Sequence, residues 1–438
     1  MTLQWSYVMH DGTKLRKKCV ILQAEKTVLS SHMNLTAKLR IISREATFPV
    51  LMSLCAVHCL NDLLQAVVSA VYPMLKDDLS LTFAQIGLIT LVYQIAASVF
   101  QPVVGYVFDK RPFVGSLPMG MVFTTLGIAL FSLAMSMPVL LVSVFLVGMG
   151  SSTLHPEASR ITSLASGGRR GLAQSIFQVG GNFGSSIGPL LVALIVAPHG
   201  RHYILWFLIV SALAFMFMRR ICRWYSSYLT DRSHSPAAGI GRRRRPLSVQ
   251  RTIIVIGIIT ILIFSKYIYM ASLTNYYTFY LIEQFGVSIR TSQICLFVFL
   301  AATAVGTLVG GPVGDRYGRK PVICMSILGT APFSLLMPHC SLTMTVILSF
   351  CAGFMLSSAF PAIHLYTQEL LPNKLGLVSG LFFGFAFGVA GIAAALLGDL
   401  IDAHGIRMVY DACAYMPLLG LVAFLIPNLK KLPGEETV

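Results

Sequence analysis

Ionisable side chains stand deep inside long apolar stretches of this chain, and these are the residues whose types could do chemistry. Asp62 lies in the first stretch and Lys266 in the seventh, each roughly 20 Å from the start of a helix that rises about 1.5 Å per residue. A charged group at that depth in a bilayer is costly, so it faces a partner or a water-filled space rather than lipid. The chemistry that we expect is proton exchange and the binding of a charged solute.

The first and fourth stretches carry residues that can hold a proton. Steps of three and four residues put His58, Asp62 and Gln65 on one stripe of the first stretch. In the fourth stretch His155 precedes Glu157 by two residues, and a histidine beside a carboxylate is suited to proton transfer. We therefore take Asp62, His155 and Glu157 as proton-coupling candidates.

A structural role explains the residues of the fourth stretch equally well. Glu157 and Arg160 are spaced as i and i+3, so they can pair within one helix. His155 would then be a neutral, hydrogen-bonded histidine beside a self-neutralising pair. The sequence leaves both interpretations open.

The seventh stretch combines a lysine with three tyrosines. On a helical wheel of about 100° per residue, Lys266, Tyr269, Tyr277 and Tyr280 share one narrow stripe. A buried ammonium group needs an acidic partner, water or an anionic ligand, and phenolic hydroxyls can hydrogen-bond an oxyanion. The pattern favours a site for an anion, with a structural ion pair as the alternative.

Polar stripes recur in the first, fourth, seventh and tenth stretches, so we expect them to line a common central space. The fifth stretch adds two glutamines and an asparagine beside its glycines. The full set of substrate-cavity candidates is His58, Gln65, Arg160, Gln174, Gln178, Asn182, Lys266, Tyr269, Tyr277, Tyr280, His364 and Gln368.

Glycines are spaced along the fifth stretch in a way that predicts close helix packing. Gly180, Gly184 and Gly188 follow one another at steps of four, and Pro189 comes next. Small residues at this spacing allow two helices to approach closely within a membrane. Simple packing and a gating role are equally compatible with the pattern.

The elements that position these residues are membrane-spanning helices. The chain has 438 residues, of which 55% are hydrophobic and 11% charged, whereas a soluble domain carries about 25% charged residues. This composition excludes a soluble or disordered chain, and the runs are too long for a transmembrane barrel. Hydropathy predicts twelve helices at about 48–72, 82–107, 114–135, 138–165, 171–197, 203–221, 251–281, 290–312, 320–338, 342–370, 375–401 and 407–427.

An internal repeat divides the chain into two similar halves. Residues 105–110 (GYVFDK) match residues 311–316 (GPVGDR) at an offset of 206 positions. The fold class is therefore an all-α membrane protein with two pseudo-symmetric six-helix bundles, at 48–221 and 251–428. A basic cytoplasmic linker at 222–250 joins them, and cytoplasmic tails at 1–47 and 429–438 flank them. Met33 offers an alternative start that would shorten the first tail.

The repeated loops predict a conformational latch. Gly318 permits a tight turn, and Asp315 can pair with a basic residue near a helix end, so that breaking the pair would bias a rocking motion. The first copy lacks this glycine and turns at Pro112 instead. The latch candidates are Asp109, Lys110, Gly311, Asp315, Arg316, Gly318, Arg319 and Lys320.

The distribution of positive charge sets the orientation. The net charge is +16, and Lys and Arg concentrate in alternate loops, as in cytoplasmic loops of membrane proteins. We therefore expect both termini in the cytoplasm and no nucleic-acid partner. The nine cysteines are scattered and show no metal-ligand spacing, so we expect no metal site.

Several long strings resemble the fosmidomycin-resistance exporters of the major facilitator superfamily. They are residues 151–160 (SSTLHPEASR), 166–186 (SGGRRGLAQSIFQVGGNFGSS), 264–272 (FSKYIYMAS) and 379–388 (SGLFFGFAFG). The resemblance covers about 48–428. It implies the major facilitator fold and efflux of an anionic, phosphonate drug from a bacterium, across the inner membrane and driven by the proton gradient.

We accordingly expect a transporter and no enzyme, because no nucleophile–base set is visible. The expected partners are a small-molecule substrate, protons and membrane lipid, with no cofactor beyond the proton gradient as energy source, and a monomer. The alternative is a proton-coupled importer of a small organic anion on the same fold, because the sequence does not set the direction of transport.

Overall fold

The structure is a computed structural model that describes residues 48–167, 170–232, 247–371 and 375–429, without the side chains of residues 109, 170–172, 231–232, 315 and 375–383. Both tails and most of the linker lie outside the described residues. The described part of the chain is helical throughout, and twelve of its helical segments are long and apolar enough to cross a membrane. The predicted all-α fold with twelve spans is therefore confirmed.

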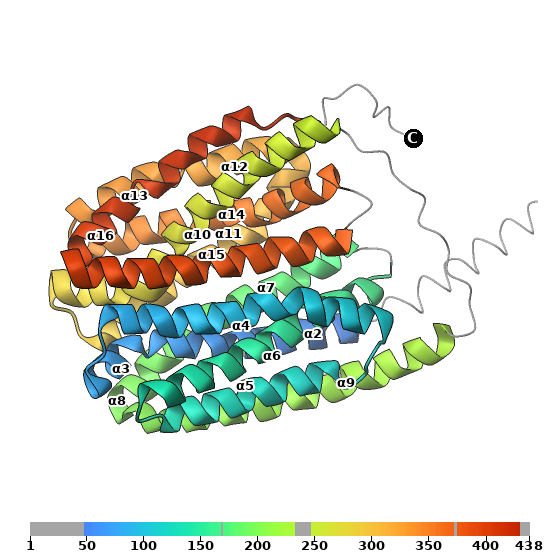
Figure 1. The fold of residues 1–438 in the computed structure, drawn as a ribbon, viewed down its shortest axis with the longest axis horizontal. Coiled ribbons are helices and arrows are strands. Elements are labelled where there is room, and N and C mark those ends of the chain that lie inside the picture. Colours follow the sequence, from blue (N-terminus) through green and yellow to red (C-terminus); the bar gives the residue numbers. More distant parts are fainter. Residues whose placement is uncertain (1–47, 168–169, 233–246, 372–374, 430–438) are drawn as a thin grey trace, which may run out of the picture.

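The first half contains α2 to α9, and the second half contains α10 to α16 (Figure 1). The long helices of the first half are α2 (Phe48–Ala70), α4 (Phe83–Lys110), α5 (Ser116–Leu133), α6 (Met137–Leu164), α7 (Arg170–Leu191) and α9 (Leu208–Arg232). Those of the second half are α10 (Val249–Phe285), α11 (Ile289–Tyr317), α14 (Leu342–Leu370) and α15 (Leu375–His404), and the shorter helices α12 (Arg319–Leu328) and α16 (Ile406–Cys413) begin its ninth and twelfth spans.

Shorter helical pieces complete several spans or join them. They are α3 (Tyr72–Leu79), a π-helical turn (Val192–Val196), α8 (Ala197–His199), α13 (Ala331–Leu336) and 3₁₀ segments at Arg201–Phe207, Met337–His339 and Met416–Leu425. The ninth and twelfth spans, predicted as single helices, are therefore interrupted. Proline explains both interruptions, since Pro332 and Pro417 stand in the first turn of the following piece, where a missing N–H costs nothing.

Helix α9 is longer than predicted. It continues to Arg232, eleven residues into the segment expected to form the linker. Side-chain contacts hold this extension against the bundle: Tyr225 is fully buried, and the Cys222 thiol donates to the carbonyl of Val114.

The two halves repeat the same internal packing. In the first half α4 lies against α6, and α5 also packs on α6; in the second, α11 lies against α14, and α12 also packs on α14. An offset of 206 residues carries the start of α4 onto the start of α11, and an offset of 205 residues carries the start of α7 onto the start of α15. Across the interface α4 packs along α15 and α7 packs along α11 (Figure 1). The second and fifth helices of each half thus form the contact with the other half, as expected from the internal repeat.

The bundle has two distinct ends. We call the end where α4 stops and α12 starts the basic end, because Lys110, Arg111, Arg319 and Lys320 lie there. The other end carries α3, α8 and α16 (Figure 1), and we call it the opposite end. Gly318, with φ of 97°, makes the turn between α11 and α12 at the basic end, as predicted, because a side chain is strained in that conformation.

Candidate functional site

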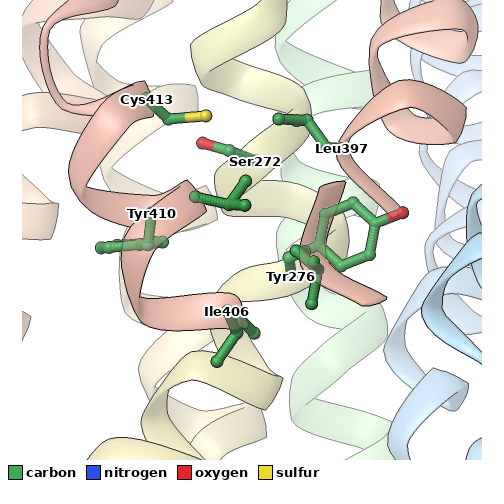
Figure 2. Close-up of a pocket in the computed structure, with 8 residues that line it drawn as sticks. Ser272, Tyr276, Leu397, Ile406, Tyr410 and Cys413 are labelled. Carbon is green, nitrogen blue, oxygen red and sulfur yellow. The ribbon is translucent and has the colours of Figure 1, made fainter. Parts of the chain in front are cut away.

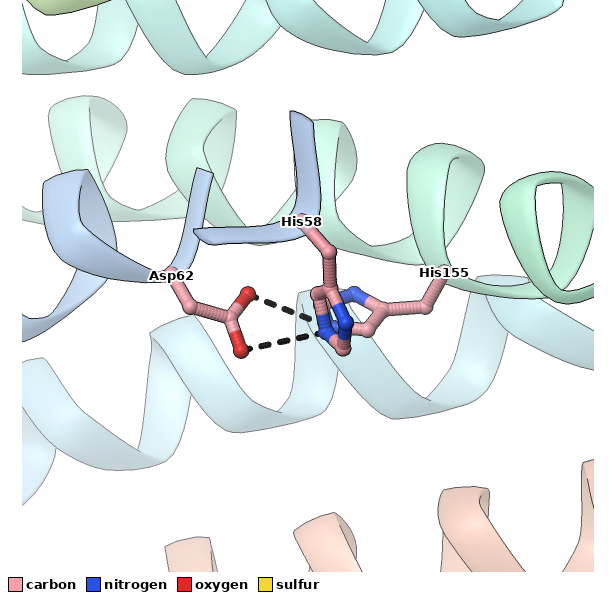
Figure 3. Close-up of side chains that lie close together, drawn as sticks. All are labelled: His58, Asp62 and His155. Atoms are coloured by element: carbon pink, nitrogen blue, oxygen red, sulfur yellow. Dashed lines mark ion pairs between the residues drawn. The ribbon is translucent and has the colours of Figure 1, made fainter. Parts of the chain in front are cut away.

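A cluster of His58, Asp62 and His155 lies inside the first half, with two members on α2 and one on α6 (Figure 3). His58 Nε2 is 3.2 Å from Asp62 Oδ2, and His155 Nε2 is 3.2 Å from Asp62 Oδ1. The two imidazole rings meet edge to face, with centroids 4.9 Å apart. Asp62 therefore uses both carboxylate oxygens to join two helices.

Backbone carbonyl groups orient both imidazole rings. His58 Nδ1 lies 2.7 Å from the carbonyl oxygen of Phe177 on α7. The His58 ring also stacks on the Phe177 ring, with the ring centroids 4.0 Å apart. His155 Nδ1 lies 3.0 Å from the carbonyl oxygen of Ser151, one turn earlier on α6, and 3.1 Å from Ser151 Oγ, whose own hydrogen is donated to Gln65 Oε1. A carbonyl oxygen only accepts hydrogen bonds, so Nδ1 is the donor in each ring. The Nε2 atoms are thereby directed at Asp62.

The glycines of α7 bring that helix against the cluster. A side chain at Gly180 would meet the backbone of Cys55, and one at Gly184 would meet the backbone of Cys59. Next to them, a Cβ at Gly181 would lie 2.7 Å from Asp62 Oδ2. The predicted close approach is confirmed, and its partner is α2; Gly188 continues it against Leu63 and Ala66. Pro189 lies inside α7, just before the π-helical turn.

Polar neighbours complete the surroundings of Asp62. Asn61 Nδ2 donates to Asp62 Oδ1 at 3.1 Å. Gln65 Oε1, one turn away, accepts from the Tyr93 hydroxyl of α4 at 2.5 Å and from Ser151 Oγ at 3.4 Å. Tyr93 is a site neighbour that sequence reasoning missed, because no spacing pattern in its stretch marks it.

His155 is the member of the cluster that faces the other half. Its ring centroid lies 6.3 Å from that of Phe387 on α15. The His155 side chain is 17% exposed, whereas that of His58 is 2% exposed. The cluster is therefore closed on the α7 side and more open where the halves meet.

Glu157 is not part of this cluster. It is 2% exposed and pairs with Arg160, with Nη2 to Oε1 at 2.5 Å and Nε to Oε2 at 3.0 Å. Arg160 also donates to the Tyr225 hydroxyl of α9. The predicted i, i+3 pair is confirmed. The carboxylate beside His155 is therefore Asp62 and not Glu157, because two residues along a helix turn a side chain to a different face.

The second half buries a lysine whose charge is not neutralised by a neighbouring carboxylate. Lys266 on α10 is 3% exposed. Its Nζ lies 5.1 Å from the ring centroid of Phe360 on α14 and 5.6 Å from that of Tyr267, and it forms no ion pair with any described residue. On α14, Gln368 Nε2 lies 3.3 Å from His364 Nε2. Lys266 of the seventh span therefore lies against the Phe360 ring of the tenth, while the contact between Gln368 and His364 lies within the tenth span.

The three tyrosines predicted to share the stripe of Lys266 are placed differently from the expectation. Tyr280 stacks on Tyr410 of α16 at 3.9 Å, and the Tyr277 hydroxyl donates to Ser349 Oγ of α14 at 3.2 Å. Tyr269 is also buried. The structure packs them inside the second half, because their rings fill the space between α10, α14 and α16. The small cavity nearby, lined by Ser272, Tyr276 and Tyr410 among others (Figure 2), has room for about one water molecule.

The remaining candidates divide between α7 and the basic end. Gln174 Nε2 donates to Ser159 Oγ of α6 at 2.6 Å, Gln178 is half-buried, and Asn182 Nδ2 is buried without a hydrogen-bond partner among the described residues. At the basic end, Arg319 pairs with Glu369 of α14 at 3.1 Å. Arg319, a predicted latch residue, thus has an ion-pair partner in Glu369, which is not among the latch candidates of the sequence analysis.

Other latch residues make local contacts. Lys320 Nζ donates to the carbonyl of Phe424 at 2.8 Å, Lys110 contacts the Tyr106 hydroxyl, and Arg316 lies over the Tyr317 ring. Gly311 is half-buried on α11. The side chains of Asp109 and Asp315 lie outside the described residues.

The cluster is the one set among the described residues whose donor atoms could also hold a metal ion. One ligand atom each from His58, Asp62 and His155 lies within 4.8 Å of the others. The sequence predicted no metal site, since the three residues come from two distant segments and match no ligand spacing. The same donor atoms can also bind protons.

The fold and these buried charged sites define a class of membrane transporter. The family model of the Major Facilitator Superfamily matches residues 54–288 and 258–437. The chain belongs to this superfamily, and it is a transporter and not an enzyme.

Two relatives are similar along most of their length. The fosmidomycin resistance protein of Escherichia coli K12 is 52% identical over 87% of this chain and 93% of its own length. The uncharacterized MFS-type transporter YfnC of Bacillus subtilis 168 is 41% identical over 88% of this chain and 94% of its own.

Solved transporter structures share the fold. A bacterial homologue of the human lysosomal transporter Spinster, inward-facing and occupied, superposes with a TM-score of 0.69 at 17% identity, covering 86% of this chain and 96% of that one. FucP in its outward conformation superposes with a TM-score of 0.62 at 18% identity, covering 88% and 100%.

Proposed function

We propose that this transporter exports a small anionic solute of the fosmidomycin type in exchange for protons, from the cytoplasm across a bacterial inner membrane, with both termini cytoplasmic. One observation carries the proposal: the first half buries titratable side chains where it meets the second half, and the second half buries a lysine that has no carboxylate beside it among the described residues. Asp62 and Lys266 are the central residues of these two sites.

Lys266 is suited to binding the anion. A buried ammonium group is unfavourable without a counter-charge, and the described residues around Lys266 supply aromatic rings instead of a carboxylate. An anionic solute would provide the missing charge. His364 and Gln368 on the adjacent helix offer further hydrogen-bonding groups.

Alternating access provides the coupling between anion and proton. At the opposite end, Asp402 of α15 binds the first turn of α4, and Gln293 Nε2 of α11 donates to the carbonyl of Ala70 at 2.6 Å. These contacts hold the halves together at that end and must break when it opens. The cluster would then take up a proton in one conformation, and Lys266 would bind the anion in the other. The proton and the anion would be exchanged across the membrane without being bound at the same time.

The similarity to the fosmidomycin resistance protein of Escherichia coli supports both the solute and the direction of transport. The first experiment expresses this chain in an Escherichia coli strain that lacks its fosmidomycin resistance protein and measures fosmidomycin tolerance. We expect tolerance to rise, and to be lost in Asp62→Asn and Lys266→Gln. The exposed residues Asp77 and Arg290 supply matched controls, Asp77→Asn and Arg290→Gln, which should behave as wild type. Unchanged tolerance with the chain present in the membrane contradicts the proposed solute.

The second experiment sets the direction and uses electrical charge. Moving one monoanion out and one proton in transfers two charges, so a membrane potential contributes about 4.6 kcal/mol per 100 mV per cycle. Import of the same anion with one proton is electroneutral. In inverted vesicles, uptake of labelled fosmidomycin should therefore respond to both an imposed pH gradient and a potassium diffusion potential. Transport that does not respond to the membrane potential and moves fosmidomycin out of the inverted vesicles would establish the importer instead.

A further inference from the structure

The geometry of the cluster limits how many protons its contacts need. Each imidazole uses its Nδ1 hydrogen on a backbone carbonyl, that of Phe177 for His58 and that of Ser151 for His155. Each Nε2 then faces a carboxylate oxygen of Asp62 at 3.2 Å. Two lone pairs at this distance repel, so each contact needs a proton of its own on either the nitrogen or the oxygen.

The charge of the cluster follows from this count. With no proton in either contact, two neutral imidazoles and one carboxylate carry a charge of −1. With one proton in each contact the charge is +1, whichever atoms hold the protons. A cation of +1 would attract an anion sharing its space. Exchange of protons for an anion therefore requires the two to be bound in different states of the transporter.

We propose that the two contacts have unequal roles: the proton between His155 and Asp62 is the one exchanged in each cycle, and the proton between His58 and Asp62 stays. This rests on the proposed function and adds to it the residue that exchanges the proton and a ratio of one proton per turnover. His155 becomes a proton-exchanging residue and His58 a positioning residue.

His58 and His155 differ in their exposure to solvent and in their position relative to the interface between the halves. His58 packs against the Phe177 ring and Gly181 of α7, and its side chain is 2% exposed, so the described residues shield it almost completely from solvent. His155 is more exposed and lies at the interface, with its ring near Phe387 of the other half. When the halves move apart, the surroundings of His155 change, while α2 and α7 stay packed through their glycine contacts.

The groups facing the cluster from other helices do not supply a competing acid or base. Tyr93 of α4 reaches toward Gln65, α7 contributes the Phe177 carbonyl and Gly181, and α15 contributes Phe387. On α2 itself the thiol of Cys59 lies near Asp62. The nearby Glu157–Arg160 pair is satisfied internally. Among the described side chains, the two imidazoles are the groups in contact with the Asp62 carboxylate that can carry the proton.

Nuclear magnetic resonance of the full chain tests the assignment without any solute. The protein is labelled with ¹⁵N-histidine, placed in lipid nanodiscs, and the ring nitrogen signals are followed with pH. We expect one ring to keep both of its hydrogens across the range in which a second ring loses one. His58→Asn should remove the first signal and His155→Asn the second, while His339→Asn, at an exposed position, should affect neither. Because no solute is present, this result stands even if the proposed function fails.

Transport by the same variants provides a second readout. The side-chain amide of His58→Asn can still donate to the Phe177 carbonyl, so this variant should keep pH-gradient-driven transport at a reduced rate. His155→Asn has no titratable group and should lose gradient-driven accumulation at least tenfold while retaining solute–solute exchange. Equal loss of coupling in both variants, titration of both rings together, or zinc found in the purified wild type but not in Asp62→Asn would each overturn the proposal.

Discussion

Asp402 Oδ2, near the end of α15, accepts a hydrogen bond from the backbone N–H of Ala84, in the first turn of α4, at 2.7 Å. Its other oxygen accepts from the N–H of Phe83 at 3.0 Å. A carboxylate of the second half therefore binds the N-terminal turn of a helix in the first half, where unpaired N–H groups and the helix dipole favour negative charge. Thr82 and Gln85 cap the same turn locally.

Replacing this carboxylate should loosen the opposite end of the transporter. In Asp402→Ala, the N–H groups of Phe83 and Ala84 lose their acceptor, so we expect their hydrogen exchange to accelerate by about tenfold. Mass spectrometry of peptides covering 82–90 measures this. Asp399→Ala, three residues earlier on an exposed part of α15, is the control. Unchanged exchange in Asp402→Ala would mean that the contact does not persist.

The glycine contact between α2 and α7 makes a clear stability prediction. A methyl group at position 184 would overlap the Cys59 carbonyl, so Gly184→Ala should destabilise the protein by about 1–3 kcal/mol through overpacking. Gly257→Ala is the matched control, since a Cβ there meets nothing within 4 Å. Thermal unfolding of the purified proteins distinguishes the two. Equal stability of both variants would contradict the close approach of the helices.

The buried Glu157–Arg160 pair should behave as a coupled unit. Removing one partner leaves an uncompensated charge, so Glu157→Gln should cost about 3 kcal/mol of stability. The double variant Glu157→Gln with Arg160→Gln should lose less than the sum of the two single variants by at least about 1 kcal/mol. A double-mutant cycle by chemical denaturation measures this coupling. Strict additivity would show that the pair contributes nothing.

The buried charge of Lys266 should lower the stability of the protein and be necessary for transport. Lys266→Met keeps a long side chain in the same apolar surroundings and removes the buried charge, so we expect the solute-free protein to unfold at a temperature higher by roughly 3 °C or more. The same variant should lose transport of the anion. Arg290→Met changes an exposed charge and should alter neither property. A destabilised Lys266→Met would indicate that the ammonium has a structural partner.

The sequence by itself determined the twelve spans, the internal repeat, the glycine stripe of α7 and the Glu157–Arg160 pair. All of these depend on residues close together in the chain or on a regular period, and apolar length alone decides whether a helix spans a bilayer. The depth of Asp62 and Lys266 likewise follows from counting along one helix. The same local reasoning did not predict that Pro332 and Pro417 interrupt two spans. A proline is tolerated in the first turn of a helix, so its presence alone does not show where a new helical piece begins.

Only the tertiary structure decided which of these residues meet. His155 pairs with Asp62 of another helix and not with Glu157, two residues away. Asp402 binds the start of a helix 318 residues earlier in the chain. Tyr269, Tyr277 and Tyr280, which share a stripe with Lys266 in the sequence, pack instead among α10, α14 and α16. Such partnerships depend on the rotation and approach of whole helices, which are set by side-chain packing across the bundle and leave no period in the sequence.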